Sequence, residues 1–203
     1  TALCERVLVL DSGKLLHDGK VGKGIEKYMA SLPTPKGNET MAQRRPGTGE
    51  LRVINAGTAT PYVYGASAKV VRFSVRRFRP YQGSYFISIH LVDGIGTVLA
   101  QCDSRLHGQW FDADSNNDFE FTISTPWLKP GSYRIDIYLC ESGFIDQFEH
   151  ACTMEVFPLL PYSGAVGSEA TAHGVVLADF TLRAVSPDGN PKENLEMHAQ
   201  IES

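Results

Sequence analysis

The sequence predicts an all-β fold, an immunoglobulin-like β-sandwich of about seven or eight antiparallel strands. Three observations support this prediction. Short runs of strand-forming residues recur at close intervals after residue 49, turn-forming Gly, Pro, Asn and Asp separate the runs, and helical periodicity is absent from this part of the sequence. The runs cover residues 50–55, 69–78, 84–92, 98–103, 118–124, 131–140, 149–157 and 174–184. We therefore expect a single sandwich domain over residues 49–185.

The first 32 residues have a different pattern and are expected to form a separate unit. The apolar run 7–10 ends at Asp11, Ser12-Gly13 then provides a tight turn, and the apolar pair 15–16 leads to Asp18-Gly19. This order predicts strand, turn and strand. A short helix over residues 24–32 is expected to follow.

Two further segments are expected to lack regular structure. Residues 33–48 are rich in Pro, Gly and Asn, which interrupt both helices and strands, so they predict an extended, polar linker. Residues 186–203 combine Pro, Gly and mixed charges and are expected to be a disordered tail.

Composition narrows the classes of function. The net charge of −4 is spread without blocks, which argues against a nucleic-acid or anionic-membrane partner. No apolar run approaches the roughly 20 residues of a membrane helix and no signal-peptide pattern opens the sequence, so we expect a soluble protein. Cys4, Cys102, Cys140 and Cys152 lack zinc-site spacing. They predict no metal site and free thiols in a reducing compartment, with a structural disulfide as the alternative.

Alternation within the strands separates core residues from candidate binding residues. In 84–92 the large apolar residues occupy every second position, which leaves Phe86, Ser88 and His90 on the other face. The same argument predicts outward-facing polar and aromatic side chains in 69–78 and 131–140. With a loop tryptophan added, the candidate site residues are Arg72, Ser74, Arg76, Ser88, His90, Trp110, Arg134, Asp136 and Tyr138.

These residue types suit a sugar-binding surface. Planar Arg and Asp side chains form paired hydrogen bonds to neighbouring hydroxyls, and an aromatic ring covers the apolar C–H face of a sugar. Trp110 lies in a loop containing Gly and Asp, where a large ring is less readily explained as core. The alternatives are that the polar face simply meets water and that Trp110 closes one end of the sandwich.

The N-terminal unit resembles the last segment of the ATPase subunit of ABC transporters, where a strand, a hairpin and a helix follow the catalytic histidine. The matching positions are Cys4, Glu5, Arg6, residues 7–10, Asp11, Gly13, Lys14, Asp18 and Gly19. The resemblance implies that residues 1–32 are the C-terminal tail of a nucleotide-binding domain.

The motifs of ATP hydrolysis are missing from this sequence. Residues 13–20 approach the phosphate-binding loop G-x-x-x-x-G-K-[ST], but the spacing is one residue too long and Val21 replaces the hydroxyl. No Leu-Ser-Gly-Gly-Gln signature occurs. We expect no catalysis and no cofactor in this fragment, and the resemblance implies ATP and magnesium only for a full-length subunit.

The part after the linker resembles the C-terminal domain of Wzt-type ATPase subunits, which belong to ABC exporters of O-antigen polysaccharide. The similar stretches are residues 47–53, 86–94, 128–135 and 174–177. The resemblance implies a cytoplasmic carbohydrate-binding module, peripheral to the inner membrane, that recognises the non-reducing end of the glycan and selects it for export. It implies the exporter's transmembrane subunit as a partner. Because ligand residues in this family vary with the glycan, no site residue follows from the resemblance.

A homodimer is expected as well. The stretch 163–172 is rich in Gly, Ser and Ala and is long enough to carry the strand predicted at 174–184 to a second copy of the chain.

Two other functions stay open from the sequence. One is a structural dimerisation or regulatory domain of a transporter ATPase that does not bind glycan. The other is a glycan hydrolase or transferase, for which Asp112 with Asp114, or Glu141 with Asp146, could supply paired carboxylates.

Overall fold

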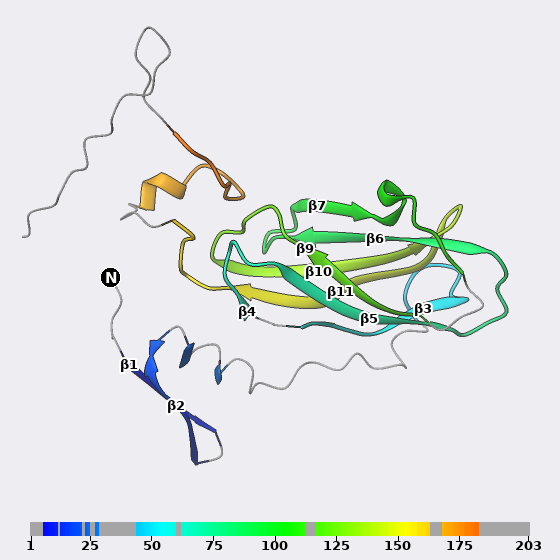
Figure 1. The fold of residues 1–203 in the computed structure, drawn as a ribbon. Helices are drawn as coiled ribbons and strands as arrows, with labels where there is room; N and C mark the ends of the chain where they lie inside the picture. Colours follow the sequence, from blue (N-terminus) through cyan, green and yellow to red (C-terminus); the bar gives the residue numbers. More distant parts are fainter. Residues whose placement is uncertain are drawn as a thin grey trace, which may run out of the picture.

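The computed structural model describes residues 6–11, 13–21, 23–24, 27–28, 44–59, 62–112, 117–162 and 168–182. Two sheets, antiparallel except for the parallel pairing of the edge strand β4 with β11, pack face to face and confirm the predicted all-β sandwich (Figure 1). The larger, six-stranded sheet contains β4 (Tyr62–Val63), β11 (Phe144–Val156), β10 (Gly131–Cys140), β6 (Ser84–Val92) and β7 (Val98–Asp103) in that order, with β8 (Phe111–Asp112) paired to β6. The smaller sheet contains β3 (Leu51–Thr58), β5 (Lys69–Arg77) and β9 (Asn117–Ile123).

The predicted inward faces form the core. Val71, Phe73 and Val75 of β5 are buried, and they lie in one cluster with the apolar residues of β6 and β10. Each inward residue is followed by a residue on the opposite face, because side chains alternate along a strand. The alternation therefore also determines which side chains of each sheet are available to a ligand.

The N-terminal residues form the predicted hairpin, in which β1 (Arg6–Asp11) pairs with β2 (Lys14–Lys20). The described residues 24, 27 and 28 are helical, while the other positions of the helix predicted over 24–32 lie outside the described residues. The helix approaches the hairpin closely, since a Cβ atom added to Gly24 would lie 2.0 Å from Val7 Cγ1.

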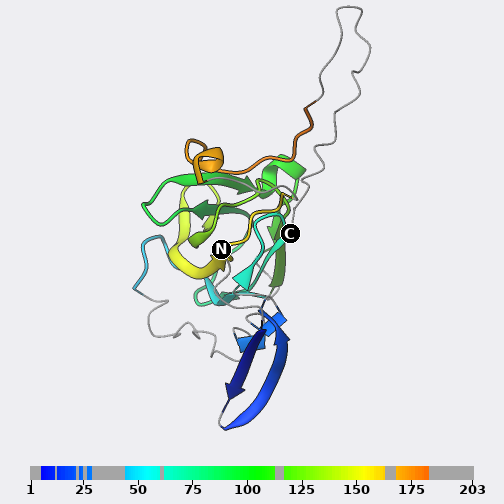
Figure 2. The same ribbon diagram turned by 90° about the vertical axis from the view of Figure 1, so that its left-hand side faces the viewer.

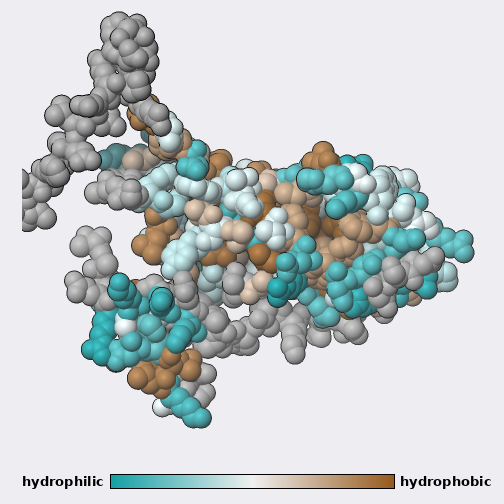
Figure 3. Space-filling model, viewed as in Figure 1, coloured by the Kyte–Doolittle hydropathy of each residue, from teal (hydrophilic) through white to brown (hydrophobic). Residues whose placement is uncertain are grey.

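The hairpin projects from one side of the sandwich (Figure 2). Its exposed Leu8, Leu10 and Leu15 give it a hydrophobic patch (Figure 3).

The strand predicted over 174–184 is not present within one copy of the chain. Residues 174–182 carry only an isolated bridge between Leu177 and Trp127, where the Leu177 amide donates to the Trp127 carbonyl at 2.8 Å. Apolar alternation favours a strand only when a neighbouring edge accepts its backbone hydrogen bonds. Residues 183 and 184, the segment 163–167 and the predicted tail over 186–203 lie outside the described residues.

A buried ion-pair network fixes the entry of the chain into the sandwich. The Asp146 carboxylate is fully buried on β11 and accepts hydrogen bonds from Arg45 Nη2 (2.6 Å), Arg52 Nη1 (2.6 Å) and the Val53 amide (2.8 Å). We call these four residues the entry network. Next to them, Gly47 has a φ of 109° and leaves no room for a side chain, because an added Cβ would lie 2.5 Å from the Ile145 carbonyl oxygen.

The described residues contain neither a membrane-spanning helix nor a metal-binding cluster. No helix in that part of the chain is long and apolar enough to cross a membrane. No group of three or more His, Cys, Asp or Glu side chains gathers there in a way that could hold a metal ion.

Candidate functional site

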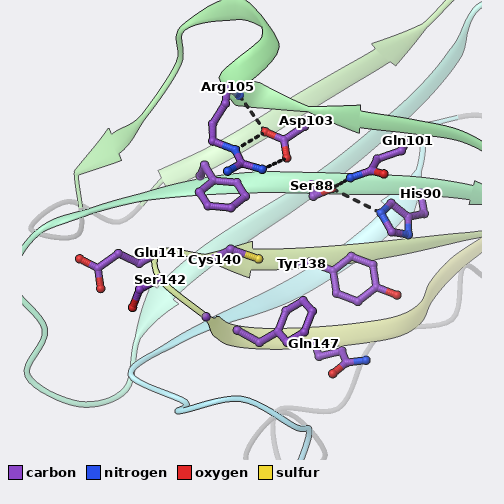
Figure 4. A pocket seen from close by; sticks show the side chains of 13 residues that line it. Ser88, His90, Gln101, Asp103, Arg105, Tyr138, Cys140, Glu141, Ser142 and Gln147 are labelled. Carbon is purple, nitrogen blue, oxygen red and sulfur yellow. Dashed lines mark hydrogen bonds and ion pairs between the residues drawn. The ribbon is translucent and has the colours of Figure 1, made fainter.

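An open pocket of about 480 Å³ lies on the outer face of the larger sheet, over strands β7, β6, β10 and β11 (Figure 4). The 3-10 helix η1 (Ser104–His107) and the turn before β11 border it. Its lining consists of aromatic, amide, carboxylate and hydroxyl side chains: Phe86, Ser88, His90, Gln101, Asp103, Arg105, Tyr138, Cys140, Glu141, Ser142, Gly143, Phe144 and Gln147. We call this the outer pocket.

Strand register arranges a polar row across the middle of the outer pocket. Tyr138 of β10 lies opposite Gln147 of β11 on one side and opposite Ser88 of β6 on the other. Ser88 in turn lies opposite Asp103 of β7. Residues directly opposite in an antiparallel pair share a face and neighbour each other. Four strands therefore place Gln147, Tyr138, Ser88 and Asp103 in one line.

The next row along the strands is apolar. Cys140 of β10 lies opposite Phe86 of β6 and Phe144 of β11. Phe86, Tyr138 and Cys140 form a small buried cluster separate from the main core. The Phe144 ring is 52% exposed and its centroid lies 5.7 Å from that of Tyr138. We call Phe86, Cys140 and Phe144 the apolar row.

Asp103 and Arg105 form the charged edge of the outer pocket. Asp103 caps η1 by accepting the Arg105 amide at 3.0 Å, and its carboxylate also accepts Arg105 Nε at 2.9 Å and Nη2 at 2.8 Å. The Arg105 hydrogen bonds hold the pKa of Asp103 below its usual range, so this carboxylate is ionised near neutral pH. The guanidinium carbon lies 3.7 Å from the centroid of the Phe86 ring.

His90 extends the polar side of the outer pocket. Its Nε2 lies 3.4 Å from Ser88 Oγ, and its ring centroid lies 4.7 Å from that of Tyr138. Burial lowers the pKa of His90, and the nearby carboxylates of Asp136 and Asp103 oppose that shift only in part. The imidazole is therefore neutral at pH 7, where it offers one donor and one acceptor.

The structure brings some of the sequence-predicted site residues together. Ser88, His90 and Tyr138 line the outer pocket. Trp110 is half-exposed beyond its border, with its ring centroid 5.3 Å from that of Phe86.

Arg134 and Asp136 lie on the same sheet but point to each other and to β11. Asp136 is 2% exposed and accepts the His150 amide at 2.8 Å, while Arg134 Nε lies 3.3 Å from the Asp136 carboxylate. Neither side chain lines the outer pocket.

The expectation that Arg72, Ser74 and Arg76 share this face needs correction. These residues belong to β5 of the smaller sheet, whose outer face is on the opposite side of the sandwich. There Arg72 pairs with Glu120 and Arg76 with Asp118, each at 2.8 Å. Alternation assigns inward and outward sides within a strand, but it does not say to which sheet the strand belongs.

Sequence reasoning did not include the other ten lining residues among its candidate binding residues: Phe86, Gln101, Asp103, Arg105, Cys140, Glu141, Ser142, Gly143, Phe144 and Gln147. Phe86 had a usable signal, since it alternates in step with Ser88 and His90. Gln101 and Asp103 become neighbours of that row only through the pairing of β6 with β7, which no local pattern shows.

The candidate carboxylates Glu141 and Asp146 are not arranged as a pair, and the pair of Asp112 and Asp114 lies partly outside the described residues. Asp146 belongs to the entry network and does not line the outer pocket with Glu141. Asp112 is exposed on β8, and Asp114 lies outside the described residues.

Fold and site together define an all-β sandwich with a pocket on the outer face of its larger sheet. No protein-family model and no curated protein matches the sequence. The C-terminal domain of wzt is a similar solved structure, with a TM-score of 0.47 and 15% identity, covering 68% of this chain and 97% of that one.

Two other solved structures are similar over smaller parts. The alkylpurine DNA glycosylase AlkC of Pseudomonas fluorescens, bound to DNA containing an abasic site analog, has a TM-score of 0.38 and 10% identity, covering 53% of this chain and 30% of that one. A glycosyl hydrolase family 2 member from Bacteroides cellulosilyticus DSM 14838 has a TM-score of 0.32 and 15% identity. The similarity covers 49% of this chain and 15% of that one. These values assign the chain to no family.

Proposed function

We propose that the sandwich is a non-catalytic module that binds the non-reducing end of an O-antigen polysaccharide in the cytoplasm and selects it for export by an ABC transporter. The observation that carries this proposal is the outer pocket, where a polar row lies beside an apolar row. The sequence resemblance to Wzt-type subunits supports the choice of glycan and transporter. In a full-length subunit, ATP and magnesium would belong to the nucleotide-binding domain and the transmembrane subunit would be its partner.

The chemistry of the outer pocket matches that of a sugar. The Asp103 carboxylate, the Gln101 and Gln147 amides and the Ser88 hydroxyl offer hydrogen bonds to ring hydroxyls. The Phe144 ring offers an apolar surface to the C–H face. An open pocket that holds one or two sugar residues gains little free energy beyond the cost of association, so we expect a Kd of roughly micromolar to millimolar.

The carboxylates support binding rather than bond cleavage. Glycosidases need one carboxyl group that stays protonated near neutral pH and a second one facing it across the scissile bond. The Arg105 guanidinium keeps Asp103 ionised instead.

A homodimer formed by exchange of residues 174–184 is part of the proposal. Val175, Phe180 and Leu182 are exposed in the described part of this segment. An apolar opening of about 500 Å³ lies between β7 and β9, lined in part by Phe73, Phe119 and Phe121. A strand from a second copy would cover this opening, and two modules on one transporter would raise the effective affinity for a polymer.

Light scattering tests the dimer. We expect a dimer that becomes a monomer when the chain is ended after Tyr162. A monomer in both cases would overturn the exchange.

Titration of the 203-residue chain with O-polysaccharide from the organism that makes it, followed by NMR or calorimetry, tests the proposed function. We expect binding to this glycan, at least tenfold weaker binding to an unrelated polysaccharide, and at least a tenfold loss with Arg105→Ala. Arg77→Ala, on β5 of the other sheet, is the matched control and should bind normally. Equal binding to both polysaccharides would overturn selection. A dimer that binds neither would favour a structural or regulatory domain.

A further inference from the structure

We propose that the outer pocket is specific for an uncharged 6-deoxyhexose, whose exocyclic methyl group lies on the apolar row while its ring hydroxyls meet the polar row. This inference rests on the proposed glycan binding and names the kind of sugar that the pocket selects.

The outer pocket has an apolar side and a polar side. The Phe144 ring, 52% exposed, supplies the open surface of the apolar row, while Phe86 and Cys140 beneath it are less than 10% exposed. Burial raises the pKa of the Cys140 thiol, so it stays protonated and behaves as a small apolar group. The polar row is the neighbouring level of the same strands, so the two surfaces are one strand repeat apart. A ligand that fits both has an apolar group on one edge and hydroxyls on the other.

A 6-deoxyhexose has this form. Its C6 methyl group projects from one edge of the ring, while the hydroxyls project from the others. In the matching hexose the same position carries a CH₂OH group, whose hydroxyl would lose water against the apolar row without gaining a partner there. A mainly apolar surface discriminates against an added hydroxyl by at most about 100-fold. Since this pocket is open to solvent, we expect roughly five- to tenfold.

The outer pocket also carries a net negative charge. Among the described residues that line the outer pocket, Arg105 is the one Arg or Lys side chain, and Asp103 already holds it in two hydrogen bonds. His90 is neutral, because burial lowers its pKa. Glu141 adds a carboxylate on the border. A uronic acid or a phosphorylated sugar would therefore meet net negative charge, and we expect such sugars to be excluded.

Matched glycosides test the specificity. The intact chain is titrated, with NMR detection, with methyl α-L-fucopyranoside and methyl α-L-galactopyranoside, which differ only in the C6 hydroxyl. Methyl β-D-glucuronide tests the exclusion of acids. We expect the 6-deoxy compound to bind roughly five- to tenfold more tightly than its hydroxylated match, and the glucuronide to bind more weakly than either.

Three variants locate the effect. Phe144→Ala should abolish the preference for the 6-deoxy compound, whereas Phe78→Ala, which removes another exposed phenylalanine outside the outer pocket, should keep it. Glu141→Gln should strengthen binding of the glucuronide.

The outcomes separate this inference from the proposed function. Equal or tighter binding of the hydroxylated sugar, or a preference that survives Phe144→Ala, would overturn the specificity. Binding of the polysaccharide without any response to the 6-deoxy compound would also overturn it and leave the proposed function standing. A chain that binds no glycan at all would overturn both.

Discussion

Asp136 is an outward-facing residue of β10 whose carboxylate is nevertheless buried. The pairing of β10 with β11 slips beside it, since Ile135 lies opposite Cys152 and Ile137 opposite Phe148. Within this bulge, His150 has a φ of 55° and its amide donates to the Asp136 carboxylate at 2.8 Å. The carboxylate thus accepts the hydrogen bond of a backbone amide that has no partner in the ladder at the bulge. The first role of Asp136 is therefore structural.

Asp136→Ala should therefore destabilise the sandwich. Removing the buried carboxylate leaves the His150 amide without its acceptor in a partly buried position, which costs roughly 1–3 kcal/mol of the free energy of unfolding. Urea unfolding monitored by circular dichroism measures this loss. Asp118→Ala is the control, because that side chain is 74% exposed and its ion pair with Arg76 is worth about 0–1 kcal/mol. Equal losses in both variants would contradict the structural role.

Lys69 is a second residue whose role depends on burial. It occupies a core-facing position of β5, is 0% exposed, and its Nζ donates to the Pro126 carbonyl at 2.9 Å. Burial lowers the pKa of Lys69 from 10.5 to about 8. Between these two values the unfolded chain binds more protons than the folded one, so the contribution of Lys69 to stability rises as pH increases from about 8 to 10.5.

The Lys69→Met variant tests this linkage. Thiols and phenols titrate in the same range, so the relevant quantity is the difference in unfolding free energy between the variant and the natural sequence. We expect the variant to be favoured most at pH 7 and progressively less toward pH 10, as the natural lysine loses its proton. A difference that does not change with pH would show that the buried amine keeps an ordinary pKa.

The strands β3 and β11 meet through the entry network rather than through backbone pairing. Asp146 of β11 binds Arg52 of β3, the Val53 amide and Arg45 of the preceding segment. Each guanidinium also donates to backbone carbonyls nearby, including those of Pro46 and Val53. A carboxylate with this many charged donors joins two sheets and the incoming chain at a single point.

Asp146→Asn should cost roughly 3–5 kcal/mol of unfolding free energy, because it leaves buried guanidinium charges without a counter-ion. Thermal unfolding and hydrogen exchange at the Val53 amide measure the effect. Glu149→Gln on the same strand is the control and should change stability by less than about 0.5 kcal/mol. Unchanged exchange at Val53 in the Asp146 variant would contradict the network.

The outer face of β5 and β9 should behave differently from the outer pocket. Arg72 and Glu120 form an exposed ion pair there, with side chains 66% and 53% accessible. Arg72→Ala should therefore change the unfolding free energy by less than about 1 kcal/mol and leave the glycan Kd unchanged. Weaker glycan binding in this variant would place a sugar contact on the smaller sheet.

The predicted elements show where local patterns suffice. Alternation in 69–78, 84–92 and 131–140 predicts the inward-facing residues, because each strand must place its apolar side chains on one core. Two short strands, β4 and β8, were missed, since two residues are too few to show a period. The start of β11 at Phe144 was also missed, because the preceding turn is only three residues long.

The candidate site was predictable only in its three residues on β6 and β10, for a related reason. Ser88, His90 and Tyr138 follow from alternation within single strands. The assignment of Arg72 to the same face failed because the neighbours of a strand are determined by contacts between distant residues. Arg105 escaped because its position depends on the capping of η1 by Asp103.

The two sheets of the sandwich have outer faces of different physical character. One carries exposed ion pairs, and the other carries aromatic and amide groups around the ion pair of Asp103 and Arg105, with the Glu141 carboxylate at its border. A ligand for the second face gains little from long-range attraction to a chain of net charge −4.

Glycan binding should therefore be nearly independent of salt. We expect the Kd for the polysaccharide to change by less than about twofold between 50 and 500 mM NaCl, since neither partner releases counter-ions. Calorimetry at the two salt concentrations measures this, with the unfolding midpoint as a check that the fold is intact. A tenfold weakening at high salt would indicate an ionic ligand instead.

The entry network also has a mechanical consequence. A pull on the chain before residue 44 reaches Arg45 first, and Arg45 is held by the Asp146 carboxylate and the Val53 carbonyl. The load passes to the long strand β11 through charged hydrogen bonds before it can peel β3 away from β5. Movements of a preceding segment would then turn the sandwich as one body, and its sheets would keep their register under tension.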